Sequence, residues 1–381
     1  MQIAMNERSL YGPKLGPRLL FESRHSGESI GWPSRGGPVA SQGYTSLLDC
    51  NSFDSPRNGL FYGLPAAVFT EHVASWGGAS SESQSRLRHT AQVKLTSAKR
   101  HAEMGQLFIG DYDLVQGAAG YVIALATVDP AVPELRELLE FLISIASADA
   151  ADFRNCGWHV FHPQNPFDEA AWAYGGHTSL GMAHGVAGLI AAMSITLLAG
   201  VAIPRQRQVI DRLTTYLLEQ RRSNQDGDWW PSALDARVLE AGNCSRDDAP
   251  LSWCVGVAGN CAAIDLAGHA LGDREYSSSA IQIFNSSLRS TSLKQRVLSG
   301  GLCHGWAGIV SAAQAISSRN QYPRLGKAAL ISAGPRPSWR DVDEAELCSL
   351  DLALDLIGSR FDASGCVYSA GGAWTRAMAI G

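Results

Sequence analysis

The sequence predicts an all-α protein built as an α/α toroid, a closed ring in which an outer layer of helices surrounds an inner one. Two observations lead to this class. A short glycine motif recurs six times along the 381 residues, and the segments between its copies are amphipathic at helical spacing. No convincing strand-like alternation of apolar and polar residues is found. The repeats predict six to seven helix hairpins.

Composition excludes several classes of protein. Hydrophobic residues make up 45% of the chain, and the net charge is −5 without a basic block, so nucleic-acid binding is not expected. No apolar run is long and continuous enough to predict a transmembrane helix, and no signal peptide is visible. The eight cysteines are widely scattered, which indicates a reducing cytoplasm and not a disulfide framework.

The repeated motif organises the chain. Strong copies are LVQGAAGYVIAL (114–125), MAHGVAGLIAAM (182–193), WCVGVAGNCAAI (253–264) and LCHGWAGIVSAA (302–313). Weaker copies lie at 60–69, where Ala66 replaces the second glycine, and at 367–378, where Ser369 replaces the first. Successive copies are 49 to 71 residues apart, which suits a pair of helices with their loops.

Two kinds of helix are expected in each repeat. Each copy of the motif opens a nearly all-apolar stretch, which is typical of a helix buried on every side. The segments 133–146, 207–222 and 342–361 instead have one apolar face, and Pro133 with the acidic residues after it marks a helix start. An open solenoid would also stack such pairs, but a closed ring is favoured because the motif carries reactive residues.

Domain boundaries and loops follow from composition. Residues 1–58 are rich in Gly, Pro and Ser and predict an irregular N-terminal extension, and 59–381 predict a single toroid domain. Loops are expected at 76–86, 228–237 and 319–340.

Reactive side chains collect just ahead of the predicted inner helices. Cys254 and Cys303 lie two residues before the first glycine of their copies, and His304 and His184 lie one residue before it. Asp113 lies four residues before Gly117. In a ring, all these positions face one end of the central cavity, where the positive ends of the helix dipoles stabilise thiolates.

Cys254, Cys303 and His304 form a good ligand set for Zn²⁺, and three protein ligands leave one position open, as in catalytic zinc sites. Cys261 lies two turns further into its helix and is expected in the core. Trp253 and Trp306 either fill space or line an apolar substrate pocket, and the sequence leaves both roles open. The remaining histidines of interest flank a loop and are expected at the surface or in hydrogen bonds: His159, His162 and His177.

Four stretches together resemble the signatures of the lanthionine synthetase C family, the lanthipeptide cyclases. They are YDLVQGAAG (112–120), GMAHGVAG (181–188), SWCVG (252–256) and CHGWAG (303–308). The resemblance covers roughly residues 60–380. It implies an α/α toroid with a central zinc ion, held by Cys254, Cys303 and His304, and acid–base roles for His184 and Asp113. Relatives often have Tyr where this chain has Val255.

The resemblance also implies a reaction and partners. The thiol of a peptide cysteine would add to dehydroalanine or dehydrobutyrine in a dehydrated precursor peptide that carries a leader, forming a thioether ring. A separate dehydratase is expected, with a transporter and a membrane-associated biosynthetic complex as further partners of a cytoplasmic enzyme. Asp113 would either orient His184 or help to deprotonate the thiol.

Three alternatives stay open. The same zinc site could add glutathione or another thiol to dehydroamino acids. A non-catalytic toroid could bind peptides as a scaffold. A zinc prenyltransferase also combines a helical toroid with a thiol substrate, but the carboxylate-rich ligand pattern expected for that class is not found.

Overall fold

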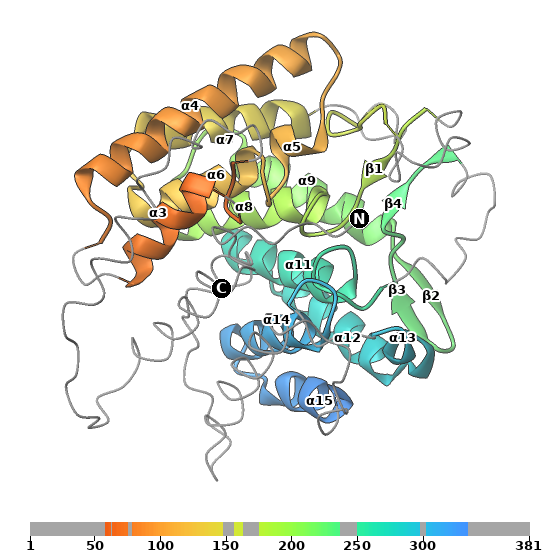
Figure 1. Ribbon diagram of the computed structural model, residues 1–381. Coiled ribbons are helices and arrows are strands. Elements are labelled where there is room, and N and C mark those ends of the chain that lie inside the picture. Colours follow the sequence, from red (N-terminus) through yellow and green to blue (C-terminus); the bar gives the residue numbers. More distant parts are fainter. Residues whose placement is uncertain are drawn as a thin grey trace, which may run out of the picture.

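The computed structural model describes residues 58–61, 63–74, 78–147, 156–162, 175–236, 250–297 and 302–333. These residues form five successive helix hairpins (Figure 1). The first helices of the hairpins are α3 (Gly63–Ala74), α6 (Ala118–Val128), α8 (Val186–Leu198), α11 (Val257–Leu271) and α14 (Trp306–Arg319). The second helices are α4 (Ser81–Glu103), α7 (Pro133–Ala146), α9 (Gln206–Glu219), α12 (Arg274–Arg289) and α15 (Pro323–Ala333).

The hairpins stack side by side into two layers. Each first helix contacts the next in chain order, from α3 through α6, α8 and α11 to α14. The second helices cover them from outside, with α7 on α6, α9 on α8, α12 on α11 and α15 on α14. The sixth hairpin, expected from 342–361 and 367–378, lies outside the described residues. The predicted all-α class, with inner and outer helices, is confirmed in the part of the chain that is described.

Burial separates the two layers as the patterning predicts. In α11, thirteen of the fifteen residues are buried, because neighbours cover the helix on every side. In α12, the buried residues lie on one face, among them Ala280, Ile283 and Phe284. An amphipathic helix with a single apolar stripe gains its stability by laying that stripe on the inner layer.

The inner helices start at the repeated glycines. Gly117, Gly185, Gly256 and Gly305 are the N-cap residues of α6, α8, α11 and α14, all with extended backbone. None of them offers a side-chain cap, so the first N–H groups of these helices point to the loops just ahead of them. The loops that carry the reactive residues therefore lie at one end of the inner layer.

The opposite end of the inner layer contains a buried charge cluster. Asp265, in the C-terminal half of α11, is fully buried and accepts hydrogen bonds from Arg319 Nε at 2.7 Å and Asn320 Nδ2 at 2.6 Å. His269 Nε2 lies 3.6 Å from the same carboxylate. Hydrogen bonds and an ion pair thus tie the C-terminal half of α11 to the C-terminal end of α14.

Two predicted loops are wrong in part. Residues 323–333 form α15, because Leu325 and Ala329, four residues apart, are both fully buried. The serine-rich stretch at 76–86 contains the start of α4, where the Ser80 hydroxyl accepts a hydrogen bond from the N–H of Ser83 at 3.2 Å and caps the helix.

Short strands also occur, contrary to the expectation of none. The strands β1 (Thr178–Ser179) and β4 (Ala233–Leu234) pair antiparallel, as do β2 (Arg222–Asn224) and β3 (Gly227–Trp229). The last two fall partly in the stretch 228–237 predicted as a loop. Strands of two or three residues are too short for their alternation to be recognised in the sequence. Two short helices complete the described elements, α5 (Ile109–Tyr112) and α13 (Thr291–Gln295).

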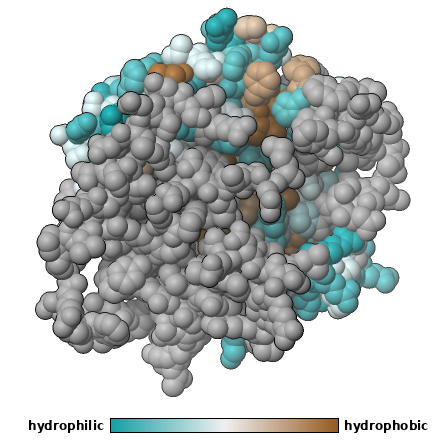
Figure 2. All heavy atoms as spheres, in the orientation of Figure 1, coloured by the Kyte–Doolittle hydropathy of each residue, from teal (hydrophilic) through white to brown (hydrophobic). Residues whose placement is uncertain are grey.

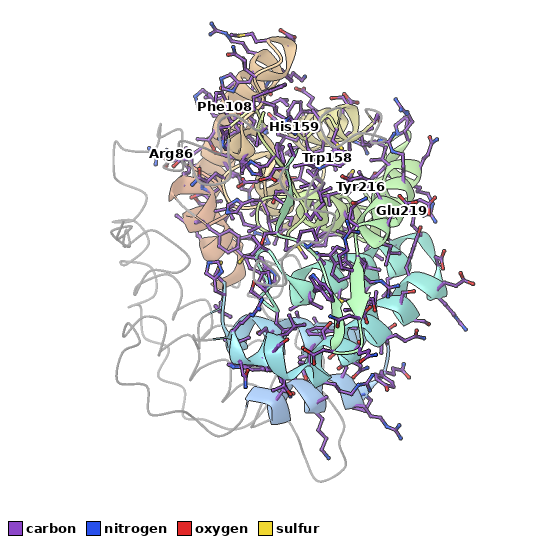
Figure 3. The ribbon with its side chains drawn as sticks, turned by 90° about the vertical axis from the view of Figure 1, so that its right-hand side faces the viewer. Arg86, Phe108, Trp158, His159, Tyr216 and Glu219 are labelled. Atoms are coloured by element: carbon purple, nitrogen blue, oxygen red, sulfur yellow. The ribbon has the colours of Figure 1, made fainter. Side chains whose placement is uncertain are left out.

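Among the described residues, few large apolar side chains are exposed. On the face in Figure 2, hydrophilic side chains predominate where described residues reach the surface, with apolar ones in smaller groups. No helix among the described residues has the length and apolar character needed to cross a membrane. On the side of the molecule shown in Figure 3, Trp158 packs edge-on against Tyr216, with ring centroids 5.5 Å apart.

Candidate metal centre and acid–base pair

Backbone hydrogen bonds join the loops ahead of the inner helices into a continuous chain. The N–H of Leu114 donates to Ala183 O at 3.1 Å, and that of Ala183 donates to Cys254 O at 2.8 Å. The N–H of Cys254 in turn donates to Cys303 O at 3.2 Å. Each acceptor lies two residues before the first glycine of its repeat, as do the donors Ala183 and Cys254, whereas Leu114 lies three residues before Gly117. This chain of hydrogen bonds holds the reactive residues of four repeats in a common frame.

Residues immediately before the repeated glycines are more open to solvent than the buried positions that precede them. Gln116, His184 and Val255 are half-buried, and His304 is exposed. Of the residues before them, Val115, Ala183 and Cys254 are each less than a tenth exposed, and Cys303 is half-buried. The loops therefore bond to one another through mostly buried residues, and the residue directly before each glycine is the one more open to solvent.

The predicted metal ligands come together in space. The ligand atoms of Cys254, Cys303 and His304 all lie within 4.8 Å of one another. Cys254 Sγ is 2.9 Å from Nδ1 of His304. Zinc–sulfur bonds of about 2.3 Å and zinc–nitrogen bonds of about 2.0 Å fit within such a span. The donor set and its spacing thus fit a Zn²⁺ ion with a fourth position left for another ligand.

The environment of Cys254 favours the thiolate that a metal needs. A hydrogen bond with Cys303 is the largest influence, and with the hydrogen bond and charge of His304 it lowers the pKa of Cys254 well below its ordinary value. Burial opposes this effect, since the side chain is 2% exposed. A cation among these groups would compensate the buried negative charge.

A second constellation lies beside the ligand set. Nδ1 of His184 is 2.6 Å from Oδ2 of Asp113, although the two residues are 71 positions apart in the chain. The other carboxylate oxygen of Asp113 accepts the N–H groups of Gln116 at 2.8 Å and Gly117 at 2.7 Å. Asp113 is 2% exposed, and it therefore holds the imidazole from a fixed position at the start of α6.

The pKa of His184 is raised above its ordinary value. Burial is the largest influence and lowers it, but the hydrogen bond and the charge of Asp113 together outweigh burial. The charges of Cys254 and His304 also act on the ring, in opposite directions. His184 thus lies within electrostatic range of the ligand set, and 44% of its side chain is open to solvent. An accessible imidazolium of this kind can act as a general acid near neutral pH.

The two tryptophans have different environments. Trp253 is fully buried, with its ring 5.9 Å from that of Phe61. Gly308 packs closely against it, because a Cβ added to Gly308 would lie 3.1 Å from Cβ of Trp253. Trp253 fills space in the core, which is one of the two roles left open for it. Trp306, the first residue of α14, is half-buried and packs against the core. A pocket-lining role for Trp306 stays a prediction.

The other singled-out residues have structural partners. Cys261 is fully buried, as expected for a core residue, and burial raises its pKa well above the ordinary value. His159 and His177 are hydrogen-bonded, as predicted, but buried: His159 contacts Thr178 Oγ1 at 3.1 Å, and Nδ1 of His177 lies 2.8 Å from the carbonyl of His162. Several cysteines lie outside the described residues: Cys50, Cys244, Cys348 and Cys366.

Two supporting residues were missed by the sequence reasoning. The hydroxyl of the buried Tyr112 donates to the carbonyl of His184 at 3.3 Å. The hydroxyl of Ser252 lies 3.6 Å from Cys254 Sγ. Ser252 stands four residues before its glycine, as Asp113 does, so alignment of the repeats could have indicated it. Tyr112 carries no such signal beyond its position next to Asp113.

A family model described as lanthionine synthetase C-like protein matches residues 41–329, about three quarters of the chain. The chain belongs to the lanthionine synthetase C-like family. The resemblance carried by the four motifs is thereby confirmed.

A solved structure agrees with the fold of this lanthionine synthetase C-like protein. The structure described as nisin cyclase superposes with a TM-score of 0.62 at 16% sequence identity. The alignment covers 88% of this chain and 83% of that one. A comparison with curated protein sequences finds no match. The similarity to nisin cyclase shows a shared fold, and the activity has to be argued from the residues of the site.

Proposed function

We propose that this protein is a zinc-dependent peptide cyclase that forms lanthionine or methyllanthionine thioether rings. One observation carries the proposal: two thiols and an imidazole with metal-ligand spacing lie within electrostatic range of a hydrogen-bonded His–Asp pair. Thiol addition to a dehydroamino acid needs both parts, one to activate the thiol and one to supply a proton. Membership of the family supports the same reaction.

Cys254, Cys303 and His304 would hold the zinc ion. When bound, zinc supplies Lewis-acid chemistry that lowers the pKa of a cysteine thiol in the substrate from its ordinary value of about 8.5. The ligand set leaves a position for that sulfur. Ser252 supports the ligand Cys254 through the contact between its hydroxyl and the ligand sulfur.

His184 would donate the proton that completes the addition. The substrate thiolate attacks the β-carbon of the dehydroamino acid, so a carbon–sulfur bond forms, the carbon–carbon π bond opens and an enolate develops on the acceptor. His184 as imidazolium then protonates the α-carbon from Nε2, because Nδ1 is engaged by Asp113. The proton lost by the substrate thiol restores the imidazolium for the next turnover, so the overall reaction is balanced.

Asp113 would orient His184 and not act as a base on the thiol. One carboxylate oxygen contacts His184, and the other accepts two backbone N–H groups. A carboxylate with both oxygens engaged and 2% exposure is arranged to position and stabilise an imidazolium. Tyr112 adds a second restraint by holding the backbone of His184.

The substrate would be a precursor peptide that contains cysteine together with dehydroalanine or dehydrobutyrine. A dehydratase has to supply those residues from serine and threonine, so it is the expected partner, with a transporter and a membrane-associated complex beyond it in a cytoplasmic pathway.

The deciding experiment measures ring formation directly. Cyclisation leaves the peptide mass unchanged but removes a thiol, so a dehydrated cysteine peptide is incubated with the zinc-loaded protein and then alkylated. The wild type and Cys261→Ala are expected to yield peptide that resists alkylation, and Cys303→Ala is not. Peptide that stays fully alkylated with the zinc-loaded wild type would refute the cyclase. A parallel incubation with glutathione distinguishes the alternative, because a glutathione adduct increases the mass.

A further inference from the structure

Gln116 occupies the repeat position of His184 and His304. All three residues directly precede the first glycine of an inner helix, and all three are at least partly open to solvent. His184 and His304 are assigned to the reaction by their chemistry, whereas Val255, at the same position of the α11 repeat, is apolar. The equivalent position of the α6 repeat is thus held by a carboxamide.

The backbone of Gln116 is tied to the acid–base pair. Its N–H donates to Oδ1 of Asp113 at 2.8 Å, and Oδ2 of the same carboxylate contacts His184 at 2.6 Å. Leu114, two residues earlier, donates its N–H to the carbonyl of Ala183, the residue before His184. These bonds fix where the Gln116 side chain begins relative to the imidazole.

The side chain of Gln116 is uncommitted. Among the residues that the structure describes, its carboxamide makes no hydrogen bond. Its Oε1 lies near Gly110, 3.6 Å from the position that a Cβ on that glycine would take, and Gly110 has no side chain with which to bond it. The residue as a whole is half-buried, and a hydrogen bond made in a partly enclosed setting contributes more than one made in bulk water.

The proposed reaction needs a donor that the His–Asp pair does not supply. As the sulfur adds to the β-carbon, negative charge moves to the carbonyl oxygen of the dehydroamino acid. Donors aimed at such an oxygen are among the largest contributions to catalysis. His184 is committed to Asp113 through Nδ1 and to the α-carbon through Nε2, and the hydroxyl of Tyr112 is engaged by the backbone of His184.

We propose that the Gln116 carboxamide contacts the substrate, with Nε2 donating a hydrogen bond to the carbonyl oxygen of the acceptor dehydroamino acid. This assignment rests on the proposed cyclase function and names a third group that touches the substrate, beside the metal ligands and His184. It also predicts that acceptor residues are recognised through their amide carbonyl and not through their side chain alone.

The test replaces Gln116 by Met, which keeps the length and the backbone N–H but removes the donors. Gln282→Met, on the exposed face of the outer helix α12, is the matched control. With a dehydrated cysteine peptide as the probe, kcat of Gln116→Met should fall by about 10- to 100-fold, a lower range than for a rigid oxyanion donor because the side chain is flexible. KM, zinc content, melting midpoint and the pH profile of kcat should match those of the wild type.

Two results would overturn the assignment. A kcat within twofold of that of Gln282→Met would show that the carboxamide does not contact the reacting carbonyl. A shifted pH profile or lost zinc would show that Gln116 acts by positioning Asp113 or the loops. Failure of the wild type itself to cyclise the peptide would instead refute the cyclase function, so the two failures are distinguishable.

Discussion

The backbone N–H of Cys254 donates a hydrogen bond to the carbonyl oxygen of Cys303 at 3.2 Å. Their thiols also interact, and this interaction is the largest of those that lower the pKa of Cys254. Two proposed metal ligands from different repeats, 49 residues apart, are thus joined through both backbone and side chain. The site is assembled by the stacking of repeats, and its geometry depends on that stacking.

Metal binding should depend on the ligand trio and not on cysteine in general. The purified wild type is expected to hold about one zinc ion per chain, as three protein ligands with an open position do in catalytic sites. Cys303→Ala should retain only a small fraction of it, and Cys261→Ala, a substitution in the core, should retain all of it. Elemental analysis by mass spectrometry checks both. Chelation should lower the melting temperature of the wild type and leave that of Cys303→Ala unchanged, because a bound metal ion stabilises the folded state. Equal zinc in both variants would contradict the assignment.

The rate of cyclisation should report the raised pKa of His184. The imidazolium is the proton donor, so kcat should decline as the pH rises through this pKa. Asp113→Asn removes the charge that raises the pKa, so the decline should begin at lower pH and the maximum should be smaller. The measurement is kcat as a function of pH with a dehydrated peptide. An unchanged profile would show that His184 is not the titrating acid.

Folding stability should change with pH through the same pair. A histidine whose pKa is raised in the folded state stabilises the fold fully below its unfolded pKa of about 6.5 and loses that contribution as the pH rises through the folded pKa. The destabilisation caused by Asp113→Asn should therefore be larger at pH 6 than at pH 9. Urea unfolding of the wild type and the variant at pH 6 and at pH 9 gives the destabilisation at each pH. The backbone contacts of Asp113 are lost at both pH values, so they cancel when the two destabilisations are subtracted. A difference of the opposite sign would exclude the ion pair.

The repeated glycines should tolerate no side chain where repeats touch. A Cβ on Gly259 would meet the carbonyl oxygen of Trp253 and lie 2.7 Å from Cβ of Met182. Gly259→Ala is expected to destabilise the protein by about 1–3 kcal/mol, the usual effect of overpacking. Gly110→Ala is the control, because only Gln116 Oε1 lies near its Cβ, at 3.6 Å. Chemical denaturation measures both, and equal midpoints would show that the close packing of repeats at Gly259 is not required.

The charge cluster at the far end of the inner layer should contribute to stability without affecting the site. Asp265→Asn leaves Arg319 without its buried partner and is expected to cost about 3 kcal/mol in the free energy of unfolding. Glu82→Gln breaks an exposed pair with Arg86 at 3.9 Å and should cost less than about 0.5 kcal/mol. Zinc content should be unchanged in both. Loss of zinc in Asp265→Asn would show that the two ends of α11 are coupled.

Repetition made much of this fold predictable. Residues buried on all sides leave an all-apolar pattern, and residues buried on one side leave a periodic one, so the inner helices and α7 and α9 could be recognised in the sequence. The start of α4 and the whole of α15 were missed because serine-rich and short glycine-containing segments resemble loops until tertiary packing buries one face of them. Strands of two or three residues carry too little pattern to be found.

The sequence by itself determined which residue types stand at equivalent points of the repeats, and hence the trio Cys254, Cys303 and His304, because equivalent positions in stacked repeats meet in space. Only the tertiary structure decided how those positions are used. It buried Trp253 in the core, set His184 against Asp113 across 71 residues, and bonded the backbone N–H of Gln116 to the same carboxylate. Residue identity is encoded locally, whereas burial and hydrogen-bond partners depend on which repeat packs next to which, and that is settled only when the chain has folded.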